Sequence, residues 1–344
     1  MVTTGKSRGE SGGHGVDRLA LAFDDERAVA NAGLVLASTL AGRLGIERVI
    51  DETLDLGERP GAARPGRKLL TLVCSALVGG DSIDDADVLR CGETQRVLGH
   101  RVMAPSTLGT FLRSFTFGHV RQLDRAFETI VGRAWAAGAG PGSEPLTIDL
   151  DSTIVEVAGQ AKQGAGFGST KRRGYHPILA TRSDTGEVLH ARMRKGSAQS
   201  QRGAERFVRE LVQRVRRLGA TGPLLVRADS GFWSNKTIAA REQHGVRYSI
   251  GVTRHESVRR AIERIPEQSW QPLDDYPPEG IAEIAEGNLS GRRLVVRRTR
   301  LVGAQAELFP DWRHHAFITD ATSRSRRSRP IIAATRRSSS PSAI

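Results

Sequence analysis

The sequence predicts an α/β protein whose core is a mixed sheet of the ribonuclease H-like kind, with an N-terminal helical domain and a β-rich insertion. Helical periodicity extends over residues 29–137 and gives way to strand-like alternation after the linker GAGPG at 138–142. Beyond the linker, the predicted order is a strand, two hairpin strands, a helix, a strand, a helix and a strand. A doubly wound sheet would instead need a helix directly after its first strand.

The helical domain consists of short segments with recognisable starts. Residues 67–80 form an apolar run ending in glycines, 82–90 start at Ser82 with acids in the first turn, and 105–116 start with a second cap signal. Short helices joined by glycine turns can form a helix-turn-helix DNA reader, although they form generic bundles more often. We therefore predict a DNA-binding role for residues 29–137, with that alternative open.

The predicted core spans residues 143–252, and its elements follow from alternation, caps and apolar stripes. They are a strand at 144–157, a hairpin at 176–194 turning at 183–186, a helix at 201–219, a strand at 223–232, a helix at 234–245 and a strand at 246–252. Residues 253–320 are predicted to be the β-rich insertion, with one helix and two strand-like runs. The glycine- and serine-rich residues 1–28 and the basic residues 321–344 are predicted to be a disordered leader and tail.

Charge and composition narrow the class of partner. The 344 residues carry a net charge of +13, which favours a polyanion such as nucleic acid, although a merely basic surface remains an alternative. Residues 321–344 hold six arginines and no acid, so +6 of that charge comes from the tail alone. Two cysteines without metal-ligand spacing predict neither disulfides nor a zinc cluster, and no membrane span or signal peptide is found. A cytoplasmic protein is expected.

Three aspartates carry the predicted chemistry. Asp149 and Asp151 alternate with apolar residues, so both carboxylates point to one face of the strand, about 6.5 to 7 Å apart. Two such charges about 4 Å apart repel by about 4 kcal/mol at an effective dielectric constant of 20, so a close pair calls for a cation or for solvent. Asp229 ends the apolar strand at 223–232, and this strand is expected beside the first one. Asp151 and Asp229 can therefore share a metal, with Asp149 as a further candidate ligand.

Basic and aromatic side chains surround these acids in the sequence. Phe232 and Trp233 follow Asp229 closely and could stack on a base, although ordinary packing is the commoner role for both. The predicted nucleic-acid contacts, for which a solvated strand face is the alternative, are Lys171, Arg172, Arg173, Arg192, Arg194, Lys195 and Trp233.

Several runs together resemble the DDE transposases of insertion-sequence family 1380, which is related to the insertion-sequence 4 group. The likeness extends from Lys68 to Asp320 and rests on GGDSIDDADVLR, PSTLGTFLRSF, LTIDLDST, KRRGYHPILATRSDTGEVLHARMRKGSAQS, RADSGF and LFPDWRHHAFITD. It implies Mg²⁺-dependent cleavage of the element's ends and strand transfer into target DNA, with Mn²⁺ as an alternative ion. The implied partners are the terminal inverted repeats, target DNA and a second copy in a homodimer. Asp151 matches the family's first catalytic acid and Asp229 its second.

The third acid of that family is a glutamate on a helix after the β insertion, and this sequence lacks it. From Ala321 to Ile344 there is no acid, no tyrosine and no lysine. One explanation is a natural basic tail that binds DNA. Another is a one-nucleotide deletion near codon 321, because the tail's possible codons, read one base earlier, can encode an acidic helix like that of the family. Either way the sequence predicts low or no cleavage, and Glu283, Glu286, Glu307 and Asp320 are poor substitutes on their predicted strands or loops.

Two other functions remain open at this stage. The run DLDST also fits a haloacid dehalogenase-like phosphatase, with Asp149 as nucleophile and Asp151 as general acid, although a hairpin rather than a helix follows it. The second alternative is a transposase remnant that binds DNA without cutting it.

Overall fold

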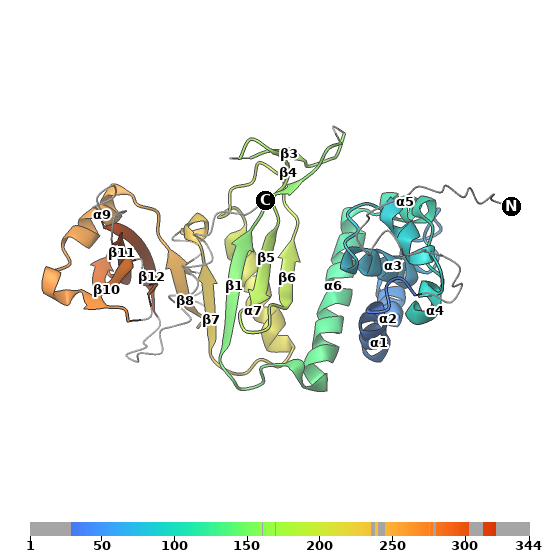
Figure 1. The fold of residues 1–344 in the computed structure, drawn as a ribbon, viewed down its shortest axis with the longest axis horizontal. Helices are drawn as coiled ribbons and strands as arrows, with labels where there is room; N and C mark the ends of the chain where they lie inside the picture. Colours follow the sequence, from blue (N-terminus) through green and yellow to red (C-terminus); the bar gives the residue numbers. More distant parts are fainter. Residues whose placement is uncertain are drawn as a thin grey trace, which may run out of the picture. The chain divides into compact units, whose positions relative to one another are not determined.

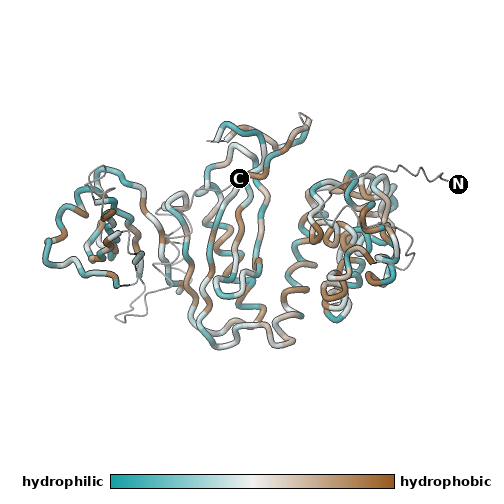
Figure 2. The backbone as a smooth tube through the Cα atoms, viewed as in Figure 1, coloured by the Kyte–Doolittle hydropathy of each residue, from teal (hydrophilic) through white to brown (hydrophobic). Residues whose placement is uncertain are grey.

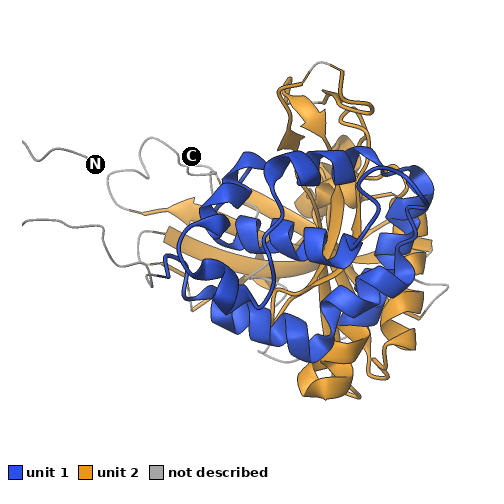
Figure 3. Ribbon diagram, turned by 90° about the vertical axis from the view of Figure 1, so that its right-hand side faces the viewer, with its two compact units in different colours: residues 1–130 blue, residues 131–344 orange. Residues whose placement is uncertain are grey.

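The computed structural model describes residues 29–159, 161–168, 170–234, 238–239, 245–274, 276–277, 280–302 and 312–320. The chain forms two compact units, Met1–Ile130 and Val131–Ile344, which meet within one long helix (Figure 3). The predicted leader at 1–28 and tail at 321–344, and most of the predicted helix at 234–245, lie outside the described residues. The domain bounds drawn from the sequence remain predictions.

The regular structure in the described part of unit 1 consists of helices. Its elements are α1 (Leu34–Leu44), α2 (Ile46–Thr53), α3 (Pro65–Leu77), the 3₁₀ helix η2 (Asp84–Arg90), α4 (Thr94–Leu98), α5 (Pro105–Arg113) and the first part of α6 (Phe117–Ala134). Phe111, Leu108 and Leu89 are completely buried, and Phe111 and Leu89 each belong to one of its two apolar clusters. Lys68 is buried among them, and its ammonium donates to the carbonyl of Gly61 at 2.6 Å. Burial lowers the pKa of Lys68.

Unit 2 is built on a nine-stranded sheet (Figure 1). Its order is β6-β5-β1-β7-β8-β12-β11-β10-β9. The strands are β1 (Leu146–Ser152), β5 (Ile178–Arg182), β6 (Val188–Arg192), β7 (Leu224–Ala228), β8 (Arg247–Gly251), β9 (Gln271–Pro272), β10 (Gly280–Leu289), β11 (Arg292–Leu301) and β12 (Arg313–Thr319).

The first five strands in this order include both neighbours predicted from the sequence, the hairpin strands β5 and β6 and the adjacent strands β1 and β7. β1 is antiparallel to β5 and parallel to β7, and β7 is parallel to β8. This is the ribonuclease H-like order of two antiparallel hairpin strands, a first strand and two parallel strands, which confirms the predicted fold class. Helix α7 (Ala204–Arg217) connects β6 to β7, and its Phe207, Val208 and Leu211 pack against the apolar residues of β1 and β7. Figure 2 shows hydrophobic residues following these central strands.

The β-rich insertion continues the same sheet instead of forming a separate one. Antiparallel pairing of β12 with β8 joins it to the core, next to α9 (Glu256–Glu263). The sequence prediction missed β10, because its GIAEIAEGNL lacks β-branched density, yet ten residue pairs with β11 hold it in the sheet. Cross-strand partners therefore decided the conformation of this segment, as is common for strands.

A second sheet was also missed. The predicted strand at 144–157 is divided into β1 and the short β2 (Val155–Glu156), which pairs with β4 (Arg173–Tyr175), and β4 pairs with β3 (Gly166–Phe167). The three-stranded sheet β2-β4-β3 lies beyond the carboxyl end of β1 (Figure 1). Within the described part of the chain, no helix is long and apolar enough to cross a membrane.

Candidate active site at the edge of the mixed sheet

One face of the central sheet is polar. Leu146, Ile148 and Leu150 of β1 are buried in the cluster covered by α7, so the alternate residues Asp149 and Asp151 point to the other face. Asp149 is paired in register with Thr181 of β5 on one side and Arg227 of β7 on the other. Arg227 is in turn paired with Ser249 of β8, so a polar row crosses four strands.

Asp149 is neutralised by an arginine. Arg227 donates from Nε to Oδ1 of Asp149 at 2.5 Å and from an Nη atom to Oδ2 at 2.6 Å, which is a two-point ion pair. Arg227 also donates to the hydroxyl of Ser183 at 2.6 Å. The arginine side chain is only 9% exposed and that of Asp149 33% exposed. This geometry fits a structural pair and leaves Asp149 poorly placed as a metal ligand or a nucleophile.

Asp151 and Asp229 have no such partner. Because Leu150 is in register with Ala228, these two aspartates are the next residues of two parallel neighbours, at the carboxyl edge of the sheet. In the described part of the chain, neither forms an ion pair with a lysine or arginine. Loss of hydration and then repulsion from Asp151 raise the pKa of Asp229, against hydrogen bonds from the Gly231 and Phe232 amides and the charge of His176. The site is therefore a pair of like charges that no lysine or arginine among the described residues neutralises.

Local backbone amides orient both carboxylates. The Ser152 amide donates to Oδ1 of Asp151 at 2.7 Å. The Gly231 amide donates to Oδ1 of Asp229 at 3.0 Å, at the start of the 3₁₀ turn η4 (Ser230–Phe232). The RADSGF run therefore has a structural explanation. The strand ends just before the acid, and Ser-Gly allows a tight turn in which the Gly231 amide faces the Asp229 carboxylate.

Sequence reasoning missed a loop that closes this edge. The Ser200 hydroxyl lies 2.9 Å from the hydroxyl of Ser152, and a side chain at Gly231 would touch Ser200 and Asp229. Nδ1 of His176 lies 2.5 Å from the carbonyl oxygen of Ala198, which directs the opposite edge of the imidazole away from the loop. The only sequence signal for this loop was the run GSAQS, which contributes to the family resemblance but to which no role had been assigned.

Arg194 holds that loop, although it had been predicted as a nucleic-acid contact. It donates from Nε to the carbonyl of His176 at 2.9 Å, and from Nη1 to those of Gln199, Ser200 and Arg202 at 2.9 to 3.0 Å. Burial lowers the pKa of this guanidinium. Its contacts show an internal clamp that fixes the loop beside the acidic pair.

The remaining predicted contacts divide into paired and exposed cations. Arg192 is ion-paired with Glu210 of α7, Arg172 with Glu156 at 2.6 Å, and Arg173 donates to the carbonyl of Gly159. The exposed lysines of the set are Lys171 and Lys195.

Both aromatic residues after Asp229 pack internally. Phe232 is completely buried in the core cluster. Trp233 packs against the cluster around Tyr248 and Ile250, and its ring lies 5.9 Å from that of His255. The packing role that the sequence left open is the one these contacts favour over base stacking.

The acids downstream of Asp229 are used elsewhere. Glu283 accepts from Arg298 in a part-buried ion pair, and Glu286 is paired with Arg293. Asp320 accepts from the Tyr248 amide at 2.7 Å, near the start of β8 and at the opposite end of that strand from Gly251. Glu307 lies outside the described residues. No group of three or more His, Cys, Asp or Glu suited to a metal ion occurs among the residues that the structure describes.

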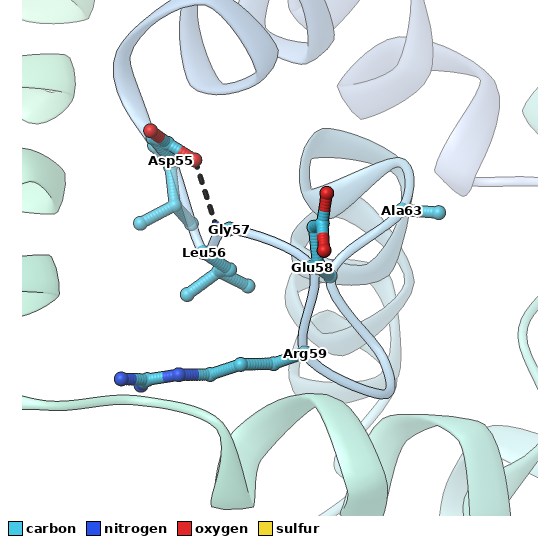
Figure 4. A pocket seen from close by; sticks show the side chains of 8 residues that line it. Asp55, Leu56, Gly57, Glu58, Arg59 and Ala63 are labelled. Carbon is cyan, nitrogen blue, oxygen red and sulfur yellow. Dashed lines mark hydrogen bonds between the residues drawn. The ribbon is translucent and has the colours of Figure 1, made fainter.

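A separate hollow lies in unit 1, in the loop after α2. It has a volume of about 390 Å³ and is lined by residues between Leu54 and Ala63 (Figure 4). Asp55 accepts from the Gly57 amide at 2.8 Å, and Arg59 donates to the carbonyl of Ser114 at 2.8 Å. These contacts stabilise the loop, and the hollow contains none of the acidic pair.

The family model described as Transposase DDE domain group 1 matches residues 14–285, which is more than half of the chain. The chain belongs to this family of DDE transposases. Transposases of this kind generally use divalent metal ions. No curated protein matches the sequence.

Two solved transposase assemblies resemble this chain. The cryo-EM structure of the piggyBac transposase synaptic complex with hairpin DNA has 13% sequence identity and a TM-score of 0.45, covering 90% of this chain and 66% of that one. The crystal structure of the Mos1 strand transfer complex has 12% identity and a TM-score of 0.20, covering 53% and 56%. The chain thus spans slightly less than two thirds of the piggyBac chain. The ribonuclease H-like assignment rests on the strand order above.

Proposed function

We propose that this transposase, a member of insertion-sequence family 1380, cleaves the ends of its element and transfers them into target DNA, using Asp151 and Asp229 to hold Mg²⁺ or Mn²⁺. The observation that carries the proposal is the pair of carboxylates at the carboxyl edge of two parallel strands, which no lysine or arginine of the described residues neutralises. Like charges in such a position call for a cation or for solvent, and carboxylate oxygens are the ligands that Mg²⁺ prefers.

In this proposal the chain's own residues bind the metal ion and contact the phosphates of the DNA. Asp151 and Asp229 each have one oxygen held by a neighbouring amide, so the carboxylate planes are fixed before a ligand arrives. The exposed Lys171 and Lys195 flank this edge in sequence and are proposed to contact phosphates. When bound, divalent ions at such a site stabilise the attacking and leaving oxygens of a phosphodiester. No covalent enzyme intermediate is required.

The described residues supply only part of the ligand set that Mg²⁺ or Mn²⁺ would need, and this lowers the activity that we expect. The described residues supply two carboxylates, and residues 321–344 contain no acid in the sequence. A site of this kind uses three acidic ligands in the family that the sequence resembles. We therefore propose that the 344-residue chain cleaves DNA weakly or not at all, and that a shifted reading frame after Asp320 accounts for the missing acid. The nucleotide sequence from codon 315 onward tests the frameshift directly.

The proposed partners are the element's terminal inverted repeats and target DNA, with a homodimer bridging two ends in the cytoplasm. A non-catalytic DNA-binding remnant is the second candidate, and it is favoured by the lack of a third acid beside Asp151 and Asp229 among the described residues. The phosphatase alternative is disfavoured, because Asp149, its required nucleophile, is held by Arg227 in a two-point ion pair.

The test compares Mn²⁺- and Mg²⁺-dependent nicking of end-containing DNA by this chain and by a version with the reading frame restored after Asp320. Nicking by the restored version should disappear in Asp151→Asn and in Asp229→Asn. It should persist in Asp184→Asn, a matched change of an acid in the β5–β6 turn, where Asp184 is paired with Arg182. Nicking that survives both active-site changes would refute the proposed site. Salt-dependent DNA binding without nicking, even in the restored version, would support the remnant.

A further inference from the structure

The small sheet β2-β4-β3 grows directly out of the acidic edge. β1 ends at Ser152, and β2 starts at Val155. On the return path, β4 ends at Tyr175, and β5 starts at Ile178. The small sheet therefore lies between the strand of Asp151 and its antiparallel neighbour, and Figure 1 shows it beyond the ends of these strands.

Glycines allow this sheet to pack closely against the segment that follows β6. A side chain at Gly196 would collide with the carbonyl oxygens of Gly174 and Gly166, and one at Gly174 with that of Val155. The Gly196 amide donates to the carbonyl of Gly164 at 3.1 Å, and Tyr175 forms an antiparallel bridge with Lys195. Backbone packs directly on backbone here, which only glycine allows. The sheet is thus a supported arm.

The arm and the segment that it packs on carry an exposed aromatic ring and several exposed cations. Phe167 on β3 is 66% exposed, in contrast to the buried Phe232 beside Asp229. Residues 153–177 contain four lysines and arginines and one acid, Glu156, which is paired with Arg172. Lys162, Lys171 and Lys195 are exposed. Exposed aromatic rings beside phosphate-seeking cations are the usual means of binding single-stranded nucleic acid.

We infer that this arm binds DNA with unpaired bases, with Phe167 stacking on one base while the lysines contact the backbone. The inference rests on the proposed function for its ligand, and it goes beyond that function by assigning the stacking to Phe167 and not to Trp233, which packs against the core. Charge complementarity selects a nucleic acid, and a DNA end held at the acidic edge, as the proposed function requires, would supply the unpaired bases.

The test measures binding of a short blunt duplex and of the same duplex carrying a single-stranded tail, by fluorescence anisotropy. Phe167→Ala should weaken binding of the tailed duplex about tenfold and leave blunt-duplex binding unchanged. Phe167→Trp, the matched control, should bind both as the original chain does. Lys171→Gln with Lys195→Gln should weaken binding of both duplexes and reduce the salt dependence.

Each other outcome is informative. If Phe167→Ala binds both duplexes like the original chain, the inference is wrong and the proposed transposase function is untouched. If the original chain binds neither duplex, both fail. If Phe167→Ala instead changes the oligomeric state in solution, Phe167 belongs to an interface between copies, and the assignment to DNA is overturned.

Discussion

Two residue pairs on the same two strands have opposite electrostatic character. Asp149 and Arg227 form a neutral pair within the sheet, whereas Asp151 and Asp229, two residues further along each strand, form an acidic pair at its edge. The two pairs share the strands, the face and the direction of the side chains. They differ in two respects: the second pair has Asp229 where the first has Arg227, and it lies nearer the ends of the strands, where it is more exposed to solvent. The charges of the first pair compensate each other within the sheet, and the second pair carries the negative charge to which we assign the proposed metal ion.

The largest expected effect comes from breaking the neutral pair. Asp149→Ala should lower the free energy of unfolding by about 3 kcal/mol, because it leaves the buried Arg227 without a counter-charge. Replacing both partners, as Asp149→Leu with Arg227→Met, should restore most of that loss. Urea unfolding of the three proteins measures this. If the single and double variants are equally destabilised, the pair has no special role.

Removing the clamp should have the next largest effect. Arg194→Gln should cost about 2 kcal/mol, because hydrogen bonds from a charged donor to several carbonyls are lost. Amide hydrogen exchange should quicken in the loop around Ser200 and stay unchanged around Asp149. Uniform acceleration across the sheet would show that Arg194 supports the whole fold and not this edge.

Asp149 and Arg194 show which features of the site the sequence could predict and which it could not. The alternation around Asp149 and Asp151 was sufficient to place both on one face, and the strand order was sufficient to place Asp229 beside them. The partner of Asp149 could not be foreseen, because it depends on the register between two strands far apart in the chain. The role of Arg194 was equally hard to predict. An arginine near the site could contact either DNA or backbone carbonyls, and the path of the loop that follows it determines which.

Neutralising the acidic pair should have a small effect of the opposite sign. Asp151→Asn and Asp229→Asn should leave the free energy of unfolding unchanged or raise it by up to about 1 kcal/mol, because each change removes repulsion between like charges. Asp184→Asn is the control, since it removes an acid that has an arginine partner. Clear destabilisation by either active-site change would mean that these carboxylates hold the fold.

The smallest effect concerns pH. The pKa of Asp229 is raised in the folded chain, so the folded state keeps this proton to a higher pH than the unfolded chain. Stability from this group is full below its ordinary pKa of 3.8 and is lost as pH rises through the raised value. The advantage of Asp229→Asn over the original chain should therefore be larger at pH 7 than at pH 3. An advantage that shrinks as pH rises would reverse the sign of the shift.

The most direct measurement of the central claim is stabilisation of the chain by Mn²⁺, followed by thermal unfolding in increasing metal concentration. Binding to the folded state alone raises the unfolding midpoint, and the midpoint keeps rising with the logarithm of the metal concentration above the Kd. The original chain and Asp184→Asn should show this rise, and Asp151→Asn with Asp229→Asn should not. An equal rise in the doubly substituted chain would contradict the assignment of the acidic pair as the metal-binding site.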